Sequence, residues 1–541
     1  MDFIFGTFAT DELKVVHHRA ARRGLQHQFE LTPRDPLPDQ PIVLTVQIGT
    51  DMRADHVVCY YTLDGTPPAG ECGTATNGTA ILLHRVETVW DAVAWGYVTR
   101  WQGTLPGQPN GTVVRYCIGA WQNDAPEVFA DWPDVTRTAE HAAAAFFRGD
   151  ELPTQPIGDP ADAHVFCLHV DRLTPPKWAY HTPIYQVFVD RFYPGDGHEW
   201  NQPDRLDGFY GGTLWGVREK LDYIQALGAG CIWLSPTWES RSHHGYDVED
   251  HYTTSDRLGG DDALYELVQS AHERGIRVLL DLPCNHLSNE HVIFTEALHN
   301  PNSVYRDWFY FDDSEIGYRS FFGVPTLPQI NVSHPAARDW LLNVARYWIK
   351  TFDVDGYRLD YANGPGPDFW ADFRAACKSA KADSFCFGEI VDQPAALLPY
   401  VGRLDGSLDF HVGEALRKTY AYGVWSEADL ARFVERHNAY FDGVGDFVRP
   451  TFLDNHDMDR FLYAAQGDQA ALRRAAAAQM QMAQPPIVYY GTEVGLSQQR
   501  SKDDGWGLEV SREPMPWGDA QDADLLAFYR AQIANWRSAH S

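Results

Sequence analysis

Acidic residues close four apolar runs in the C-terminal part of the chain. The runs end in Asp-Leu-Pro-Cys-Asn-His (281–286), Gly-Tyr-Arg-Leu-Asp (356–360), Phe-Gly-Glu-Ile (387–390) and Phe-Leu-Asp-Asn-His-Asp (452–457). This grouping suits cleavage of a glycosidic bond, which needs a nucleophile, a general acid and groups that hold the sugar. A strand-end Asp is more often a helix N-cap, but four such ends converging on one rim are hard to explain by capping.

Two of these acids differ in their expected pKa. Arg358 precedes Asp360 by two residues and so lies on the same face of its strand, where a cation should keep the pKa of Asp360 low. Glu389 lies in the apolar run Phe385–Ile390 with no cation within three residues, so desolvation should raise its pKa, as a general acid requires. A metal site is the alternative. The spacings contain no HxH or HExxH pair, and Cys284 is the only cysteine in these segments, so we predict no metal ligands.

Strands and helices alternate from about residue 184 onward. The predicted strands are Ile184–Phe192, Cys231–Leu234, Ile276–Leu282, Asp355–Tyr361, Phe385–Val391, Leu404–Phe410, Arg449–Leu453 and Ile487–Tyr490. Eight such units predict an α/β fold, a (β/α)8 TIM barrel whose active site lies at the C-terminal ends of the strands. The helix after the first strand is expected to place Val217, Leu221, Ile224 and Leu227 on one face, and the last helix to span Ala523–Ala539. The interval 287–333 is too long for a plain loop and predicts an inserted subdomain B over the barrel mouth.

Residues 1–178 follow another pattern, in which short β-rich runs alternate with turn signals. The runs are Gln26–Leu31, Pro41–Gly49, His56–Leu63, Thr79–Trp90, Trp95–Leu105 and Thr112–Trp121. They predict an N-terminal β-sandwich domain, followed by a Pro-rich linker that contains Pro153, Pro156, Pro160, Pro175 and Pro176. The catalytic barrel is then expected over 179–286 and 334–541. No C-terminal β-domain is expected, because the chain ends at Ser541, directly after the last predicted helix.

Composition narrows the class of protein. The 44 Lys and Arg residues against 74 Asp and Glu residues give a net charge of −30, which argues against a nucleic-acid partner. No apolar run approaches the ~18 residues of a membrane span, and the N-terminus lacks the basic and apolar regions of a signal peptide. The eight cysteines are scattered, which favours free thiols in a reducing cytoplasm.

The four segments resemble the four short motifs of the α-amylase family, glycoside hydrolase family 13, and occur in that family's order. Tyr185–Phe192 is similar to its first strand, Gly245-Tyr246-Asp247 to its sugar-stacking tyrosine loop, and Tyr489-Tyr490-Gly491 to its eighth strand. Residues 327–331, Leu-Pro-Gln-Ile-Asn, resemble a marker at the end of the inserted domain. This marker and an N-terminal β-domain are typical of the cyclomaltodextrinase, neopullulanase and maltogenic amylase branch.

The resemblance implies roles for individual residues. Asp360 would be the nucleophile, Glu389 the acid/base and Asp457 the third carboxylate, which grips sugar hydroxyls. The residues implied in substrate binding or its support are Tyr246, Asp281, His286, Arg358, His456 and Arg512. Three alternatives stay open: Tyr246 as a core tyrosine, Asp281 with Asn285 as architectural support, and Arg512 as a solvated surface residue.

Three positions depart from the branch's pattern. Gly364 stands where an acidic residue commonly follows the Ala-Asn of the second motif, a position that influences water versus sugar as acceptor. Thr213 replaces the Asp of a Gly-Gly-Asp triplet, which weakens an expected calcium site, and the eighth-strand Asp is Thr492. We therefore expect no cofactor, with calcium, for example near Asn285, as the alternative that the family leaves open.

The resemblance implies a cytoplasmic, retaining glycoside hydrolase that cleaves α-glucosidic bonds of maltooligosaccharides, cyclodextrins or related α-glucans. Two rivals remain: an α-glucan transglycosylase that uses the same carboxylates, and an inactive α-amylase-like carbohydrate-binding protein. Intact Asp360, Glu389 and Asp457 argue against the second rival. The N-terminal domain is expected to act in substrate selection or in a homodimer.

Overall fold

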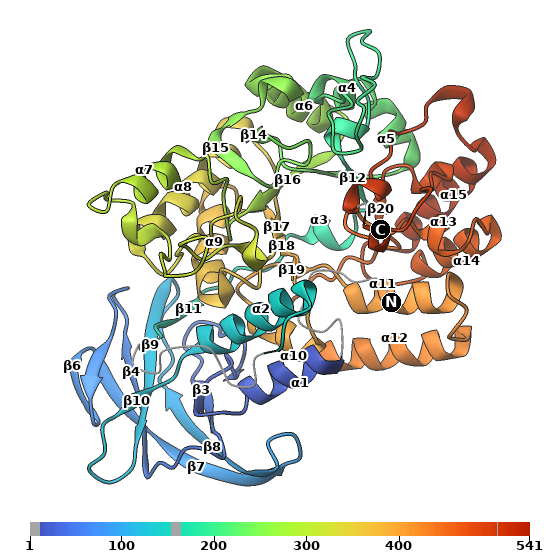
Figure 1. Cartoon of the computed structure of the whole chain (residues 1–541). Coiled ribbons are helices and arrows are strands. Elements are labelled where there is room, and N and C mark those ends of the chain that lie inside the picture. Colours follow the sequence, from blue (N-terminus) through green and yellow to red (C-terminus); the bar gives the residue numbers. More distant parts are fainter. Residues whose placement is uncertain (1–10, 153–163, 506, 541) are drawn as a thin grey trace.

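The computed structural model describes residues 11–152, 164–505 and 507–540. An antiparallel β-domain forms the N-terminal part, and a parallel sheet surrounded by helices forms the remainder (Figure 1). Among the described residues, no helix has both the length and the apolar character to cross a bilayer.

One long strand organises the antiparallel part. The first half of β7 (Thr79–Asp91) pairs with β4 and its second half pairs with β8, so the sheet runs in the order β1-β3-β8-β7-β4-β9-β10. In addition, β2 pairs with β3, and β11 pairs with β9. Side chains from both halves, such as Val46 and Ile118, share one apolar core. The other strands are β1 (Leu25–Gln26), β2 (Leu31–Thr32), β3 (Ile42–Ile48), β4 (His56–Thr62), β5 (Ala69–Glu71), β6 (Thr74–Asn77), β8 (Gly96–Leu105), β9 (Thr112–Trp121), β10 (Val128–Phe129) and β11 (Phe166–Val170).

Two predictions for this part are wrong. The expected strand Gln26–Leu31 is interrupted: Gln26 ends β1, Leu31 begins β2, and residues 27–30 connect the two strands, with Phe29 in a left-handed backbone conformation (φ 51°). The expected linker contains β11, which pairs antiparallel with β9 and so belongs to the sheet. Residues 153–163 of that linker lie outside the described residues. Helices α1 (Asp11–Ala20) and α2 (Trp132–Arg148) were not predicted.

The parallel sheet has the order β19-β18-β17-β16-β13-β12-β20. Its strands are β12 (Ile184–Val187), β13 (Cys231–Leu234), β16 (Arg277–Pro283), β17 (Gly356–Asp360), β18 (Phe385–Gly388), β19 (Gly406–Ser407) and β20 (Ile487–Tyr489). The predicted seventh strand, 449–453, is reduced to two parallel bridges, Gly406 to Val448 and Thr451 to Pro486. These bridges connect the two edge strands, so the sheet curls round as the predicted barrel requires. Because both faces are buried, the strands are almost continuously apolar.

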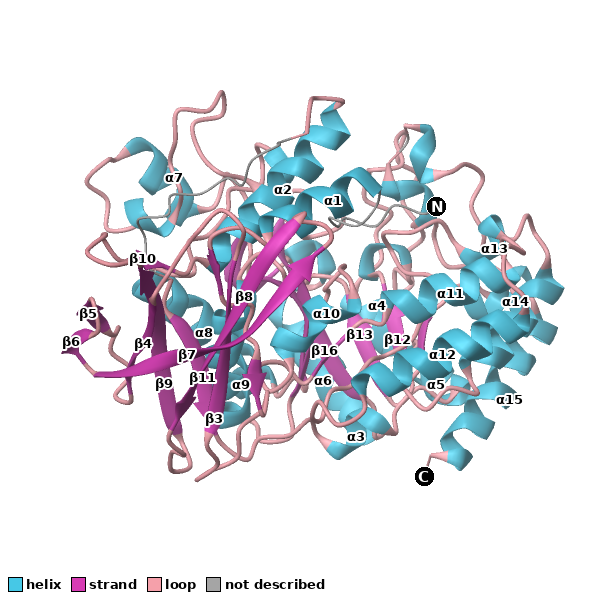
Figure 2. Ribbon diagram, turned by 90° about the horizontal axis from the view of Figure 1, so that it is seen from below, coloured by secondary structure: helices cyan, strands magenta, loops and turns pink. Residues whose placement is uncertain are grey.

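Helices lie outside the parallel strands (Figure 2). The predicted helix with Val217 and Leu227 is divided into α4 (Leu214–Glu219) and α5 (Leu221–Leu227), whereas the last helix, α15, has the predicted bounds Ala523–Ala539. The remaining helices are α3 (Lys177–Tyr180), α6 (Gly260–Glu273), α7 (Val292–His299), α8 (Pro335–Phe352), α9 (Gly366–Ala380), α10 (Pro394–Leu397), α11 (Phe410–Tyr420), α12 (Glu427–Phe441), α13 (Phe461–Ala464) and α14 (Gln469–Gln479).

Two connecting segments border the same end of the sheet. The segment after β13 forms a hairpin of β14 (Trp238–Ser240) and β15 (Val248–Thr254), and the segment after β16 contains α7. The segment after β16 also contains the short helix η4 (Phe321–Gly323), against which α2 of the N-terminal part packs. Helix α1 packs on α2 in turn. Helix α2 therefore touches the segment that borders the end of the sheet where the motif residues lie, and α1 supports α2 from behind.

Asp372 on α9 joins the barrel to the N-terminal sheet. Its Oδ2 lies 2.9 Å from Nη2 of Arg115 in β9 and 2.7 Å from Nη1 of Arg338, and its Oδ1 lies 2.8 Å from Nε2 of His169 in β11. Although burial opposes ionisation, His169 and the two arginines hold the pKa of Asp372 far below its ordinary value. The carboxylate is therefore charged and saturated with donors at neutral pH.

We predict that Asp372→Asn destabilises the protein. The substitution leaves Arg115 and Arg338 largely buried without their carboxylate, which typically costs about 3 kcal/mol. Because the pKa of Asp372 is lowered in the folded state, the contribution is present at neutral pH and is lost as the pH falls below the ordinary range of Asp. Scanning calorimetry should show a lower Tm for Asp372→Asn. The control is Asp207→Asn, which removes an exposed pair with Arg205 and should leave Tm almost unchanged. Equal Tm values for both variants would contradict the prediction.

Candidate active site

The motif acids come together because their strands are neighbours in register. Asp281 of β16 pairs with Arg358 of β17, and Leu359 of β17 pairs with Gly388 of β18. Asp360 is the last residue of β17, and Glu389 follows β18 directly. All lie at the C-terminal end of the sheet, where a barrel's active site is expected.

Arg358 is the centre of the site. Its Nη1 lies 2.8 Å from Oδ1 of Asp281 and 3.0 Å from Oδ1 of Asp360, and its Nη2 lies 2.8 Å from Oε2 of Glu389. The arginine is fully buried. No cation lies within three residues of Glu389 in the sequence, but Arg358 reaches it from the adjacent strand. Adjacent strands lie only about 4.8 Å apart.

Burial raises the pKa values of both principal carboxyl groups. The pKa of Glu389 rises to about 8, because burial and Asp360 outweigh the opposing effect of Arg358. The pKa of Asp360 rises to about 6, again through burial, although Arg358 lowers it. The predicted rise for Glu389 is confirmed, and the predicted low value for Asp360 is wrong because the cation does not offset desolvation. The predicted order of the two pKa values is nevertheless kept, because Asp360 ionises at lower pH than Glu389.

Asp457 has its own set of cations and donors. Its Oδ1 lies 3.0 Å from Nη2 of Arg512, and its Oδ2 lies 3.1 Å from Nε2 of His456. Burial opposes ionisation, but His456, Arg512 and Arg358 together lower the pKa of Asp457. Arg512 is 3% exposed and also donates from Nε to the backbone oxygen of His456 at 2.9 Å. The alternative of a solvated surface arginine is therefore wrong.

Tyr246 and His286 flank the carboxylates. Tyr246 lies in the turn between β14 and β15, is only partly buried, and donates its hydroxyl to Oδ2 of Asp281 at 2.9 Å, so the core-tyrosine alternative is wrong. Its ring lies parallel to that of His456, at 8° and 5.5 Å between centroids. His286 is buried, with Nε2 4.0 Å from Oδ2 of Asp360, and its ring packs against Phe321 of η4. The structure thus brings every predicted site residue to one end of the sheet.

Three supporting residues were missed by the sequence analysis. Gln186 of β12 donates to Nδ1 of His456 at 2.8 Å, and Trp233 of β13 donates from Nε1 to Oδ2 of Asp281 at 2.9 Å. Both are buried strand residues. A glutamine within an otherwise apolar strand is a signal in the sequence that indicates a buried polar contact. The backbone N–H of Tyr361 donates to Oε2 of Glu389 at 3.1 Å, which no sequence pattern announces.

Gly364 lies tightly against Asn285. A Cβ at position 364 would collide with Oδ1 of Asn285, whose amide already accepts a hydrogen bond from Gln329 at 3.1 Å. A side chain at position 364 therefore fits only if Asn285 moves.

Near the Gly211-Gly212-Thr213 triplet, the side chains of Thr213 and Asp190 are engaged by the chain itself. Thr213 donates its hydroxyl to the Pro194 carbonyl at 2.6 Å and caps α4 by accepting from Gly216 at 3.0 Å. Asp190 is paired with Arg191 at 2.7 Å. Calcium needs several free oxygen ligands, so this loop does not fit the ion.

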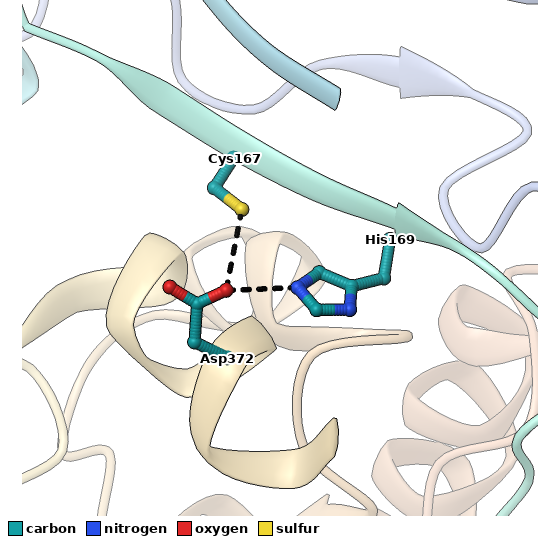
Figure 3. A group of neighbouring side chains, drawn as sticks. All are labelled: Cys167, His169 and Asp372. Carbon is teal, nitrogen blue, oxygen red and sulfur yellow. Dashed lines mark hydrogen bonds and ion pairs between the residues drawn. The ribbon is translucent and has the colours of Figure 1, made fainter. Parts of the chain in front are cut away.

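Among the described residues, one group has the composition of a metal site: Cys167, His169 and Asp372 (Figure 3). The Asp372 carboxylate is the one already paired with Arg115 and Arg338. Two guanidinium groups on the same carboxylate oppose the binding of a further cation there. The group lies between β11 and α9 and fastens two parts of the chain rather than forming a metal centre.

Comparison with known proteins establishes the family. The family model described as "Alpha amylase, catalytic domain" matches residues 186–532. The chain is 39% identical over 376 residues to Alpha-amylase 2 of Dictyoglomus thermophilum, covering 69% of this chain and 66% of that protein. It is 32% identical over 393 residues to a Cyclomaltodextrinase of Bacillus sp, covering 70% and 69%. The match thus spans about two thirds of these relatives. The chain belongs to the α-amylase family, as its motifs predicted.

A solved structure agrees with this assignment. The ligand-free cyclic α-maltosyl-(1→6)-maltose hydrolase of Arthrobacter globiformis is 30% identical and has a TM-score of 0.61, covering 67% of this chain and 84% of that one. Family members share a TIM barrel, and the curled parallel sheet described above matches it.

The site predicts a bell-shaped pH dependence of glycosidic cleavage. Asp360 must be ionised and Glu389 protonated at the start, and the two groups titrate as a coupled pair. The rate should rise as the pH passes through about 6 and fall as it passes through about 8. A pH profile of kcat/KM on a maltooligosaccharide measures both limbs. The control Glu273→Gln, an exposed residue of α6, should leave both limbs in place. A profile without an alkaline limb would contradict the assignment of Glu389.

Proposed function

We propose that this protein is a retaining glycoside hydrolase that cleaves α-glucosidic bonds in maltooligosaccharides, cyclodextrins or related α-glucans. One observation carries the proposal: Arg358 joins Asp360 and Glu389, two buried carboxyl groups on adjacent strands with different pKa values. Retaining enzymes need such a pair about 5–5.5 Å apart, which strands spaced roughly 4.8 Å apart can supply.

The reaction proceeds in two displacements. In the first, a carboxylate oxygen of Asp360 attacks the anomeric carbon, the glycosidic C–O bond breaks, and Glu389 gives its proton to the departing oxygen. In the second, Glu389 takes a proton from water, the water oxygen bonds to the anomeric carbon, and the bond to Asp360 breaks. Each inversion reverses the other, so the product keeps the α-configuration.

The remaining site residues bind and position the sugar. Asp457 stays ionised and can accept hydrogen bonds from sugar hydroxyls as the ring distorts. Burial lowers the pKa of His456 to about 3 and that of His286 to about 4, so both are neutral at the working pH and can bond hydroxyls. Tyr246 offers its partly exposed ring for stacking. Asp281 holds Arg358 and Tyr246 in place.

The names of relatives point to the substrate class. A cyclomaltodextrinase and a hydrolase of cyclic maltosyl-maltose are among the proteins that this chain resembles. Position 364 influences whether water or a sugar is the acceptor, and Gly364 has no side chain there. Transglycosylation, in which a sugar is the acceptor, is therefore the second candidate function. Product sizes at high maltooligosaccharide concentration separate the two, because transfer yields products longer than the substrate.

We also propose a division of the chain into domains. We assign 1–178 to an N-terminal β-sandwich domain, 179–286 and 334–541 to the catalytic barrel, and 287–333 to an inserted subdomain B. The antiparallel sheet shared through β7 and the contact between α2 and η4 support that division.

A homodimer remains a prediction that light scattering would test. A cytoplasmic location fits the eight free cysteines, of which Cys72 alone is exposed.

Substitution of the carboxylates tests the roles. Asp360→Asn removes the nucleophile and should lower kcat at least about 10⁴-fold. Glu389→Gln should cost least on aryl glycosides whose acidic phenol leaves without a proton, because general-acid catalysis contributes about 10²–10⁴-fold only where a proton is needed. Glu273→Gln, outside the site, should retain full activity.

The anomer released first tests retention itself. Proton NMR before mutarotation should show the α-anomer as the initial product from an α-linked substrate. An initial β-anomer would mean inversion and would overturn the assignment of Asp360 as nucleophile.

We also propose that the enzyme needs no calcium. Thr213 and Asp190 are engaged within the chain, so chelator should leave kcat and Tm unchanged. Activity and calorimetry are measured with and without excess chelator, and then after calcium is restored. A loss of either that calcium reverses would contradict the proposal.

A further inference from the structure

Trp233 lies one layer below the active site, inside the barrel. It is a residue of β13, is 1% exposed, and pairs in parallel register with Leu279 of β16. Asp281 follows Leu279 by two residues, so its side chain points to the same face, one layer nearer the C-terminal end of the sheet. The indole of Trp233 spans that step, and its Nε1 donates to Oδ2 of Asp281 at 2.9 Å. Trp233 therefore contacts the site from below and, being buried, does not touch the substrate.

The acceptor of Trp233 is unusual for this protein. Among the described residues five tryptophans are fully buried, and four of them donate to backbone oxygens: Trp238 and Trp348 to His251, Trp370 to Ala362, and Trp536 to Met482. A buried indole N–H usually finds a partner of this kind. Trp233 donates to a carboxyl group instead, and a hydrogen bond to an ionised group is roughly twice as strong as one between neutral groups. Its N–H therefore acts on the charge of Asp281 as well as on packing.

Asp281 shares Arg358 with the catalytic pair. Nη1 of Arg358 lies 2.8 Å from Oδ1 and 3.0 Å from Oδ2 of Asp281, and it lies 3.0 Å from Oδ1 of Asp360. Tyr246 donates its hydroxyl to Oδ2 of Asp281 at 2.9 Å, and the same hydroxyl oxygen lies 2.5 Å from Nε2 of His456. Burial raises the pKa of Asp281 to about 7, although Arg358 opposes the rise. Asp281 therefore changes its charge between the pH values at which the catalytic pair titrates.

We propose that Trp233 is a positioning residue whose N–H keeps Asp281 ionised beside Arg358 and thereby sets the pH range of catalysis. A hydrogen bond donated to a carboxylate favours its ionised form. With Asp281 ionised, part of the charge of Arg358 is offset, so the catalytic carboxyl groups stay protonated to higher pH. With Asp281 neutral, the full guanidinium charge acts on Asp360 and Glu389 and lowers the pKa of each. This inference rests on the proposed function, because it concerns the same catalytic pair.

The ring of Trp233 has a packing role that can be separated from the bond. Its centroid lies 5.2 Å from Cζ of Arg358, and the rings of Phe387 and His456 meet it edge-on at 5.9 Å, with interplanar angles of 89° and 86°. Trp233→Phe keeps an aromatic ring among these neighbours and removes the N–H. The substitution therefore deletes the hydrogen bond to Asp281 while most of the aromatic contact is retained.

The pH profile of kcat/KM on maltotriose tests the role of Trp233. In Trp233→Phe both limbs should move to lower pH by about 0.5–1 unit, because Asp281 is then neutral over more of the range. The matched control is Trp348→Phe, which removes the N–H of another fully buried tryptophan, bonded to the backbone oxygen of His251 at 2.8 Å. Calorimetry records the loss of stability in each variant, and only Trp233→Phe should shift the limbs. Limbs that stay at the positions of the parent protein, or that move equally in Trp348→Phe, would overturn the proposal.

Nuclear magnetic resonance of the parent protein tests the contact without using activity. With its 18 tryptophans labelled by ¹⁵N, one indole N–H resonance should shift with a midpoint near pH 7, as Asp281 titrates. That shift should be lost in Asp281→Asn, and the resonance should be absent from Trp233→Phe. The first two observations do not require Trp233→Phe to fold.

Two results of the titration decide between the inference and the function on which it rests. If no indole resonance titrates, or if its titration persists in Asp281→Asn, the inference about Trp233 is overturned whatever the activity. If the titration is present but the parent protein hydrolyses no α-glucan, the proposed function fails, while the bond from Trp233 to ionised Asp281 is upheld.

Discussion

A single buried guanidinium group holds the site together. Arg358 contacts Asp281, Asp360 and Glu389, which come from three consecutive strands of the sheet. Three carboxyl groups so close together in a buried site would repel one another if all were ionised. Arg358 permits ionisation of some of them, and burial keeps Glu389 protonated to higher pH than Asp360. The cation therefore fixes the geometry and the sequence of ionisation at the same time.

That arrangement depends on the parallel sheet. In register, Asp281 lies beside Arg358, and the C-terminal ends of β17 and β18 place Asp360 and Glu389 on neighbouring strands. A shift of one residue would turn these side chains to the other face of the sheet. Buried apolar residues on both faces make such a shift costly, so packing of the barrel sets the distances on which catalysis depends.

Sequence reasoning succeeded where the determinant is local. The bounds of α15 and of the strand Cys231–Leu234 follow from apolar periodicity and flanking turn residues, and both match the structure. Most of the motif residues were found for the same reason, since they lie at the end of a strand that the pattern predicts. Spacing along the chain does not reveal contacts between residues that are far apart in the sequence. For that reason, the cation beside Glu389 and the burial of Arg512 were missed.

Other errors have the same origin. Strand β11 lies in a Pro-rich stretch that reads as linker, and only its pairing with β9 makes it a strand. The predicted low pKa of Asp360 counted the charge of Arg358 and left out desolvation, which depends on the surrounding fold. Charge near in sequence is visible from the sequence, whereas burial is a property of the assembled structure.

Backbone strain lies beside the chemistry. Tyr361 directly follows Asp360 and has φ 39°, and Phe322 of η4 has φ 47°; their rings meet at 5.2 Å. Such conformations cost roughly 1–3 kcal/mol each for residues other than glycine. At Tyr361 the sharp turn aims the backbone N–H at Oε2 of Glu389. At Phe322 it sets a ring against Tyr361, on the segment that α2 supports. The packing of the N-terminal helices thus helps to hold a strained wall next to the nucleophile, and this gives the N-terminal part a physical connection to the active site.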